Sequence, residues 1–241
     1  MKIRSISLLI IFFLTFNSNL RADTIFFDSE NIKIEDNGDM IFATKGKARI
    51  PSNNLIIEGD KFIYNKKISE LIILDDVKYF DKENSIYMEG QKLIYNEIEN
   101  TILSKNETYI ISENIYEINS SDVLYKRNKN KIFSDKLTIV NDNNENKFLF
   151  NEGLTIDLFK EIISSKKVTV TDKNYNKYFF ENSKINLKIN EIVGKEIFVE
   201  FEDSFFGDKN NDPLLKGKSV TSNSKNTKIF KTVFSTCNME Y

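Results

Sequence analysis

The sequence predicts an all-β protein built from a repeated unit of about 31 residues, and three observations support this. The 241 residues include 33 Ile, 20 Phe and 10 Tyr but only three Ala, a composition that favours strands over helices. Apolar runs are short and are separated by Asn, Asp, Lys or Gly, which is typical of strands joined by turns. The third observation is the repeat itself, which predicts a stack of like units.

The N-terminus has the layout of a secretory signal peptide. Lys2 and Arg4 precede an apolar run over residues 6–16, and Ala22 stands directly before Asp23. This run is shorter than the roughly 20 apolar residues that span a bilayer. We therefore expect residues 1–22 to be a signal peptide, with an uncleaved N-terminal anchor as the alternative.

The repeat is clearest between residues 54–65 and 85–96. Glu58-Gly59, Lys61 and Ile63-Tyr64-Asn65 return 31 positions later as Glu89-Gly90, Lys92 and Ile94-Tyr95-Asn96. Looser copies follow at residues 114–125, 147–158 and 177–187. Second apolar segments lie at residues 71–74, 101–103, 131–133, 162–163 and 192–193, and third segments at 77–80, 108–111, 137–140, 168–170 and 197–201. We expect each unit to hold two or three short strands.

Apolar residues alternate along the copies, so equivalent strands place a common set of side chains on one side of the sheet. This set comprises Phe62, Tyr64, Leu93, Tyr95, Val123 and Tyr125. A single unit cannot bury such a face, whereas stacked units can. Two interpretations remain open: the ladder is core packing, or it lines an open groove for an apolar ligand.

The composition excludes several kinds of chemistry. There is no His and only one Cys, so Ser-His-Asp and Cys-His nucleophiles, His-ligated zinc and intrachain disulfides are all ruled out. The formal charge of −2 is not typical of a nucleic-acid-binding protein. We predict no catalytic residue, no metal ligand and no cofactor.

Two segments carry a family resemblance. Residues 37–50 read Asn-Gly-Asp-Met-Ile-Phe-Ala-Thr-Lys-Gly-Lys-Ala-Arg-Ile, followed by Leu-Ile-Ile-Glu-Gly-Asp-Lys-Phe-Ile-Tyr-Asn at 55–65. This pattern resembles the repeat of the OstA family of lipopolysaccharide-transport proteins, although Ala48 replaces a commoner Val and Ile57-Glu58-Gly59 replaces an Ala-Asp step. Leu214–Ser222 and then Phe234-Ser-Thr-Cys237 are similar to the end of the periplasmic domain of LptD-like members. The resemblance covers about residues 24–238.

The resemblance implies a β-jellyroll over residues 23–238, a V-shaped stack of antiparallel strands, followed by a tail at 239–241 with no barrel in this chain. It implies a non-enzymatic role at the periplasmic face of the outer membrane, where lipopolysaccharide acyl chains lie in an apolar groove. The six ladder residues are then the candidates for lining that groove. By the same resemblance, Cys237 forms a disulfide with a cysteine of a barrel portion; a free thiol is the alternative.

The implied partners are lipopolysaccharide, an LptA-like bridge protein that joins by edge-strand pairing, an outer-membrane barrel and an LptE-like lipoprotein, with no nucleic acid. Unpaired strand edges at the ends of a stack would permit such joining. Three alternatives remain. The chain is a free-standing LptA-like bridge, a structural β-solenoid with a filled core, or a carbohydrate-active β-helix enzyme with paired acids.

Overall fold

The computed structural model describes residues 25–112, 116–142, 145–202, 213–223 and 225–235. The predicted signal peptide, Cys237 and the tail lie outside these ranges. The described residues form one antiparallel sheet of 16 strands, with three short 3-10 turns (Asp36–Gly38, Pro51–Asn53 and Arg127–Lys129) as their only helical segments. The prediction of an all-β fold is therefore confirmed. Within the same ranges, no helix is long and apolar enough to cross a membrane.

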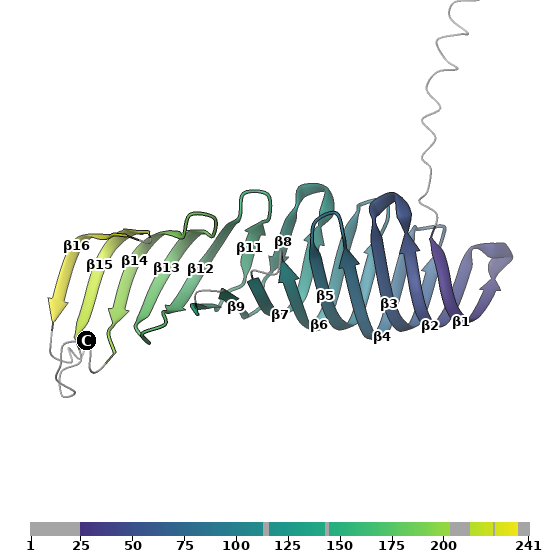
Figure 1. Cartoon of the computed structure of the whole chain (residues 1–241), viewed down its shortest axis with the longest axis horizontal. Helices are drawn as coiled ribbons and strands as arrows, with labels where there is room; N and C mark the ends of the chain where they lie inside the picture. Colours follow the sequence, from purple (N-terminus) through teal and green to yellow (C-terminus); the bar gives the residue numbers. More distant parts are fainter. Residues whose placement is uncertain (1–24, 113–115, 143–144, 203–212, 224, 236–241) are drawn as a thin grey trace, which may run out of the picture.

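The strands are β1 (Phe26–Glu35), β2 (Met40–Ile50), β3 (Leu55–Asn65), β4 (Glu70–Asp81), β5 (Ile86–Asn96), β6 (Thr101–Ser112), β7 (Tyr116–Lys126), β8 (Lys131–Ser134), β9 (Thr138–Asp142), β10 (Lys147–Phe150), β11 (Leu154–Asp157), β12 (Ile162–Thr171), β13 (Lys177–Asn186), β14 (Glu191–Glu200), β15 (Leu214–Ser222) and β16 (Thr227–Ser235). They follow one another along an elongated stack, with β1 at one end and β16 at the other (Figure 1).

The turns along one edge of the stack show the repeat directly. Each has a residue in the left-handed region, with φ between 48° and 54°, at Ser69, Asn100, Asn130, Glu161 and Asn190. These positions are 29 to 31 residues apart. Asn tolerates this backbone conformation better than most residues, because its short polar side chain can hydrogen-bond locally.

Each unit holds two strands, within the expected two or three, but these strands are long rather than short. The structure joins the second and third apolar segments into one long strand that bends in its middle. In β4, residues 71–74 and 77–80 flank Asp75 and Asp76, whose φ angles are 62° and 46°. The strand pairing shifts register there and then continues. Left-handed residues therefore turn the strand without ending it, and each unit consists of two folded strands.

Similar bends give most strands two arms that meet at a corner, with left-handed residues at Lys45, Asn106, Asp122, Lys167, Glu196 and Lys231. We name the arm that carries Ile57, Tyr79 and Met88 arm 1, and the arm that carries Tyr64, Leu71 and Tyr95 arm 2. We call the space between the two arms the interior. We call the side opposite the corner, where the outer turns of arm 1 face those of arm 2, the mouth.

The middle of the stack keeps this layout with a break at the corner. The short strands β8 and β11 continue arm 2 between β7 and β12, while β9 and β10 continue arm 1 between the same two strands. The segments 135–137 and 151–153 therefore replace the sharp bend. We call β1–β7 the N-terminal half and β10–β16 the C-terminal half.

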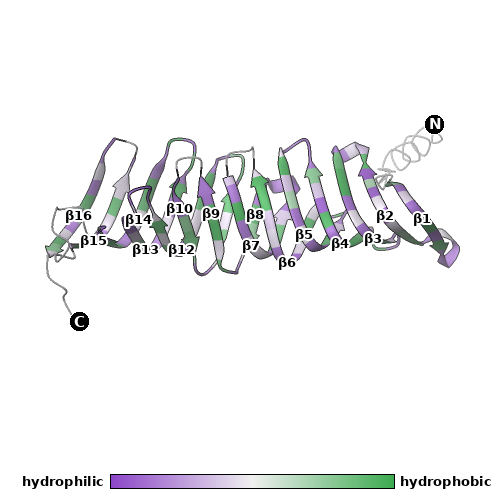
Figure 2. Cartoon of the chain, turned by 60° about the horizontal axis from the view of Figure 1, so that its bottom comes forward, coloured by the Kyte–Doolittle hydropathy of each residue, from purple (hydrophilic) through white to green (hydrophobic). Residues whose placement is uncertain are grey.

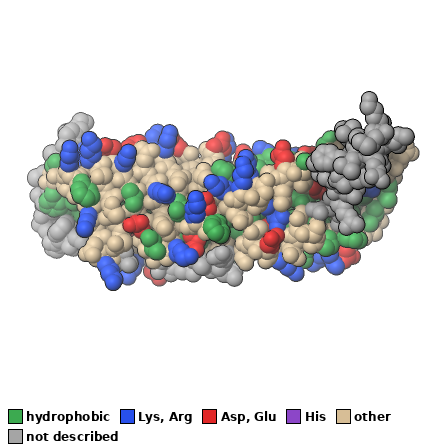
Figure 3. Space-filling view, turned by 90° about the horizontal axis from the view of Figure 1, so that it is seen from above, with side chains coloured by type: hydrophobic (Ala, Val, Ile, Leu, Met, Phe, Trp, Pro, Cys, Tyr) green, Lys and Arg blue, Asp and Glu red, His purple; other side chains and the backbone are tan. Residues whose placement is uncertain are grey.

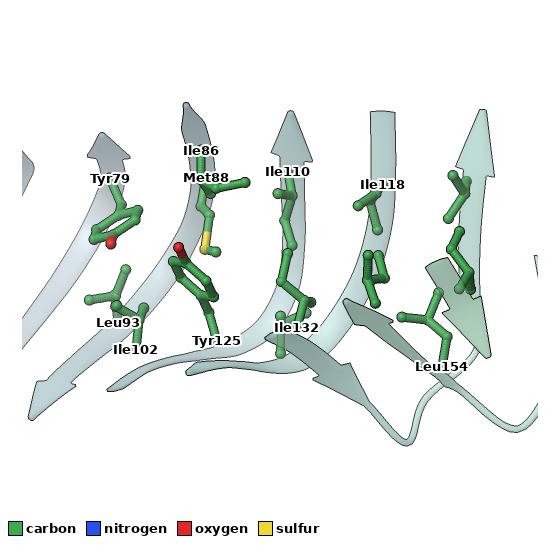
Figure 4. Packing of buried hydrophobic residues seen from close by; sticks show 14 of the residues in the cluster. Tyr79, Ile86, Met88, Leu93, Ile102, Ile110, Ile118, Tyr125, Ile132 and Leu154 are labelled. Carbon is green, nitrogen blue, oxygen red and sulfur yellow. The ribbon is translucent and has the colours of Figure 1, made fainter. Parts of the chain in front are cut away.

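Apolar side chains from the two arms meet in the interior. Figure 4 shows Tyr79, Met88 and Ile110 on one row of strands pointing toward Leu93 and Tyr125 on the other. All five side chains are at most 2% exposed. Along each strand, hydrophobic and hydrophilic residues alternate (Figure 2), as expected for a sheet with one buried face. Burial of each large side chain contributes about 1.5–3 kcal/mol.

Beside the corner, the large side chains come from arm 2 in the N-terminal half and from arm 1 in the C-terminal half. In the N-terminal half, the row of arm 2 beside the corner holds Phe62, Ile73 and Leu93, and the facing row of arm 1 holds Val77, Gly90 and Thr108. In the C-terminal half, arm 2 holds Ser165, Ser183 and Gly194, and arm 1 holds Val168, Phe180 and Ile197. Each half thus fills its corner from the opposite arm, which keeps the packing dense.

Candidate functional site

A buried ion pair holds the two arms together at the mouth of the N-terminal half. Arg127 follows the arm 2 end of β7, and Asp81 ends β4 on arm 1. Arg127 Nε donates to Asp81 Oδ2 at 2.6 Å and Nη2 to Oδ1 at 3.2 Å, with side chains only 3% and 0% exposed. Nη1 donates to Asn100 Oδ1 at 3.1 Å, and Nη2 also lies within hydrogen-bond distance of the carbonyl oxygen of Asn53 and of Glu83 Oε2, at 3.0 and 3.2 Å. We call these five residues the Arg127 cluster.

Tyrosine hydroxyls complete the hydrogen bonds around this cluster. Tyr79 and Tyr125 donate to Asp81 Oδ2 at 3.4 and 3.3 Å, from arm 1 and arm 2 respectively. Burial and the Asp81 charge raise the pKa of both phenols, so they stay protonated as donors. Asn53 donates to the Tyr95 hydroxyl at 2.9 Å, which is a further contact between the arms. Because the polar atoms of the cluster have partners, the mouth is closed at low energetic cost.

The six predicted ladder residues all point into the interior of this closed half. Tyr64, Tyr95 and Tyr125 share one row, with Leu71 and Ile102 between them, as the pairings of β3 to β7 show. Phe62, Leu93 and Val123 share the next row. All six are at most 5% exposed and belong to the continuous core. The structure therefore brings them together, in an interior filled by the side chains of the protein itself.

The C-terminal half contains a groove between the two arms. It has a volume of about 510 Å³, within the range of about 300–1,000 Å³ that is usual for ligand sites. Its walls are apolar, whereas Asp, Asn, Ser and Thr side chains of the outer turns, together with Lys173, form its rim. Arm 1 contributes Phe148, Val170, Tyr178, Phe180 and Ile197, and arm 2 contributes Ile185, Leu187, Ile192 and Val220. We call this the C-terminal groove.

The outer turns of arm 1 are built in the same way in both halves. Asp81, Asp142 and Asp172 each accept a backbone N–H and a side-chain N–H from an Asn three or four residues later, at 2.9 to 3.1 Å. As Tyr79 does at Asp81, Tyr178 donates to Asp172 at 3.0 Å. Burial and the charge of Asp172 raise the pKa of Tyr178 to about 12.

The opposite turns differ in one residue. The backbone N–H groups of Arg127, Leu158 and Leu187 donate to the carbonyl oxygens of Asn100, Asn130 and Glu161, so these three residues occupy equivalent positions in successive units. Arg127 crosses the mouth to Asp81, whereas Leu187 lines the C-terminal groove together with Asp172. Among the described residues, no cation lies within 4 Å of the Asp172 carboxylate. Within the described ranges, the Asp172 turn thus has no ion pair of the kind that Asp81 makes with Arg127.

The groove suits an occupant without hydrogen-bonding groups. Its wall strands already use their backbone N–H and C=O groups in pairing with their neighbours. A peptide buried there would leave its own backbone groups unpaired, at about 1–3 kcal/mol each. An unbranched hydrocarbon chain has no such groups, and polar atoms attached to it could remain at the polar rim.

The candidates predicted from the sequence lie in the other half, because the repeat is most regular there. Phe148, Tyr178, Phe180, Ile185 and Leu187 of the groove come from the looser copies at 147–158 and 177–187. One available signal was the change from Arg127 to Leu158 and Leu187 at the period of the repeat. Another was Arg127 itself, one of four arginines among 34 basic residues.

Nothing in the described ranges forms a group of three or more His, Cys, Asp or Glu side chains able to hold a metal ion. Cys237, the predicted disulfide residue, lies outside those ranges. Comparison with known protein families and with curated protein sequences gives no match. The functional argument therefore depends on the groove and on the resemblance described above.

Proposed function

We propose that this chain binds the acyl chains of a lipid in the C-terminal groove, as a lipopolysaccharide-transport jellyroll at the periplasmic face of the outer membrane. The observation that supports this is an apolar groove between two sheet arms with a polar rim. The order of signal peptide, repeats and the ending Phe234-Ser-Thr-Cys237 supplies the lipopolysaccharide part of the proposal.

The physical chemistry of carriage fits this geometry. Each methylene removed from water contributes about 0.8 kcal/mol, so burial of most of an acyl chain yields enough free energy for specific binding. The apolar walls would take the chain, and the Asp142, Asp172, Asn186 and Asn190 turns would face the sugar part. Such binding needs no catalytic group, metal or cofactor.

The ends of the stack fit the proposed protein partners. Among the described residues, β1 pairs only with β2 and β16 only with β15. An LptA-like bridge protein could add a strand at such an edge, and a free-standing bridge would use both edges. The outer-membrane barrel, the LptE-like lipoprotein and the Cys237 disulfide are parts of the proposal that depend on the resemblance alone.

Site-specific photo-crosslinking tests the groove. A photoreactive phenylalanine analogue at half-buried Ile192 should capture purified lipopolysaccharide, because Ile192 lines the groove. The same analogue at Lys184 is the matched control, since this exposed residue alternates outward between buried Ser183 and Ile185. Equal capture at both positions, or none at Ile192, would show that the groove is not the lipid site.

A second candidate function is a structural β-solenoid, and the filled interior of the N-terminal half favours it. In that case the C-terminal groove would be an incompletely packed part of the core. Crosslinking separates the two functions: a structural protein would give no capture from Ile192 at any lipid concentration, while its thermal stability would not respond to lipid. A lipid carrier should be stabilised on binding its ligand.

A further inference from the structure

Arg127 and Leu187 occupy the same turn position two units apart. Asp81 ends β4, three strands before the Arg127 turn, and Asp142 stands at the same offset from the Leu187 turn, because it ends β9 in the arm 1 order β9, β10, β12, β13. Both aspartates accept a backbone and a side-chain N–H from an Asn of their own turn. Arg127 is bonded to both arms, whereas Leu187 adds one apolar wall to the groove.

This difference coincides with the change from a filled to a hollow interior. Next to the Arg127 cluster, Tyr79, Tyr95 and Tyr125 are 0% exposed and fill the space between the arms. Next to Leu187, the arms enclose about 510 Å³. A guanidinium that donates to arm 1 and arm 2 at 2.6 to 3.2 Å fixes their separation at the mouth, and a leucine cannot do so.

We propose that Arg127 is a specificity-determining residue that confines the bound lipid to the C-terminal groove, so that the interior accepts a single acyl chain. This inference rests on the proposed function, because it concerns the ligand of the same groove. The class of ligand it defines is an amphiphile that inserts one unbranched chain through the C-terminal mouth. Any further chains of a multiply acylated lipid would need the Arg127 cluster to open.

The dimensions of the groove agree with one chain. A methylene group occupies about the volume of a water molecule, about 30 Å³ in the liquid, so 510 Å³ corresponds to about 17 methylenes. On arm 1 the lining residues run from Asp142 on β9 to Ile197 on β14, with four interstrand spacings between them. At about 4.8 Å per spacing the groove is about 19 Å long. A single common acyl chain fits this length and volume.

The first test enlarges the groove. The full chain and its Arg127→Leu variant would be incubated with a diazirine-bearing palmitate and irradiated, with stoichiometry read by native mass spectrometry. We expect one palmitate per wild-type chain, attached to residues of the C-terminal groove. The variant should bind at least two, with labels that extend to Tyr95 and Ile102 in the N-terminal half. If unpaired Asp81 prevents folding, Arg127→Leu with Asp81→Asn removes both charges and serves the same purpose.

The second test closes the groove. Leu187→Arg places a guanidinium across the groove from the Asp142 turn, at the position that Arg127 occupies across from Asp81, so palmitate binding should fall at least tenfold. The matched control is Ile189→Arg, two residues further along the same turn, where the native side chain is 55% exposed. This control should bind palmitate as the wild type does. Unchanged melting temperatures would show that both variants are folded.

The outcomes separate this inference from the proposed function. If the wild type binds one palmitate and the Arg127→Leu chain also binds only one, the role assigned to Arg127 is wrong while lipid binding stands. Unaltered binding by Leu187→Arg would overturn the same role. If the wild type binds no palmitate and no lipopolysaccharide, the proposed function itself fails.

Discussion

At the scale of single residues, the chemistry of arginine explains how the arms are held together. The guanidinium carries five N–H donors in a rigid plane and is less strongly hydrated than an ammonium group. Arg127 uses this plane to bind Asp81 on arm 1 and Asn100 on arm 2 at once. A lysine at this position would offer one compact charge and could not reach these partners in the same geometry. In a chain with far more lysines than arginines, the arginine is used where its shape is needed.

Removal of Arg127 should strongly destabilise the protein. Arg127→Ala would leave the Asp81 carboxylate buried without its cation, which typically costs about 3–5 kcal/mol in the free energy of unfolding. Urea unfolding followed by circular dichroism measures this. Arg49 is the matched control, because its ion pair with Asp28 at 3.0 Å is exposed. Arg49→Ala should cost at most about 1 kcal/mol. Equal losses for the two variants would contradict the importance of the buried pair.

The same pair should make stability depend on acid pH. Burial alone would raise the pKa of Asp81, but hydrogen bonds from Arg127 and Asn84 and the Arg127 charge outweigh it and lower that pKa below its ordinary value. Because the pKa is lower in the folded state, Asp81 contributes stability above its unfolded pKa of about 3.9, and this contribution is lost as pH falls through the folded pKa.

Urea unfolding at a series of pH values between about 3 and 7 would test this dependence. We expect the free energy of unfolding of the wild type to fall in the acid part of this range. The fall should be smaller in the variant Arg127→Leu with Asp81→Asn, which lacks the titrating carboxylate. Parallel curves for the two proteins would show that Asp81 does not contribute.

At the scale of structural elements, the exchange of large and small residues at the corner couples neighbouring strands. A Cβ atom added to Gly194 on β14 would lie 2.4 Å from Phe180 Cδ1 on β13. Gly194→Ala should therefore destabilise the protein by about 1–3 kcal/mol. Phe180→Leu would provide space, so the double variant should lose at least about 0.5 kcal/mol less than the sum of the two single changes.

The control for this coupling lies on the same strand. Phe179 is next to Phe180 but contacts Phe198, with ring centroids 5.7 Å apart. Phe179→Leu combined with Gly194→Ala should therefore be additive. Coupling with Phe179 but not with Phe180 would mean that the corner is not packed as described.

The elements also show how far the sequence could predict this fold. The period of 31 residues and the alternation in 54–65 and 85–96 predicted the strands and their inward side chains. The sequence left open whether residues 71–74 and 77–80 form one strand or two, with Asp75 and Asp76 between them. Both residues take left-handed angles within a continuous strand. Residue types alone do not separate these outcomes, since they depend on whether the neighbouring strands remain paired across the bend.

The candidate site was less predictable than the fold. Local alternation identified Tyr95 and Tyr125 as inward residues, but their exposure depends on side chains from the opposite arm. Asp81 and Arg127 are 46 residues apart, and their pairing follows only from the folding of two strands over each other. The groove is lined by Leu187, at the turn position that Arg127 occupies two units earlier. An alternation pattern reports which face a residue occupies, and it carries no information about the distance between two facing arms.

At the scale of the whole molecule, the rows of apolar interior side chains continue to the terminal strands at both ends of the stack. On β1, Ile32 and Ile34 are 51% and 62% exposed and extend the rows of Ala43 and Ile41. On β16, Phe234 is 50% exposed and extends the row of Leu215. Hydrophobic side chains are visible at both ends among charged ones (Figure 3). Strand edges at the end of a sheet that carry exposed apolar residues are sites where another β-sheet can attach.

The two ends differ, so association between copies should be head to tail, with β1 of one copy beside β16 of the next. Sedimentation velocity should then show oligomers that grow with protein concentration. Ile34→Lys blocks the β1 end and Phe234→Lys blocks the β16 end, because a lysine in the interior row would be buried in the joint. Each variant alone should be monomeric. Their equimolar mixture should form dimers and nothing larger, since each copy retains one intact end. Monomers in the mixture, or oligomers of either variant alone, would contradict head-to-tail joining through these edges.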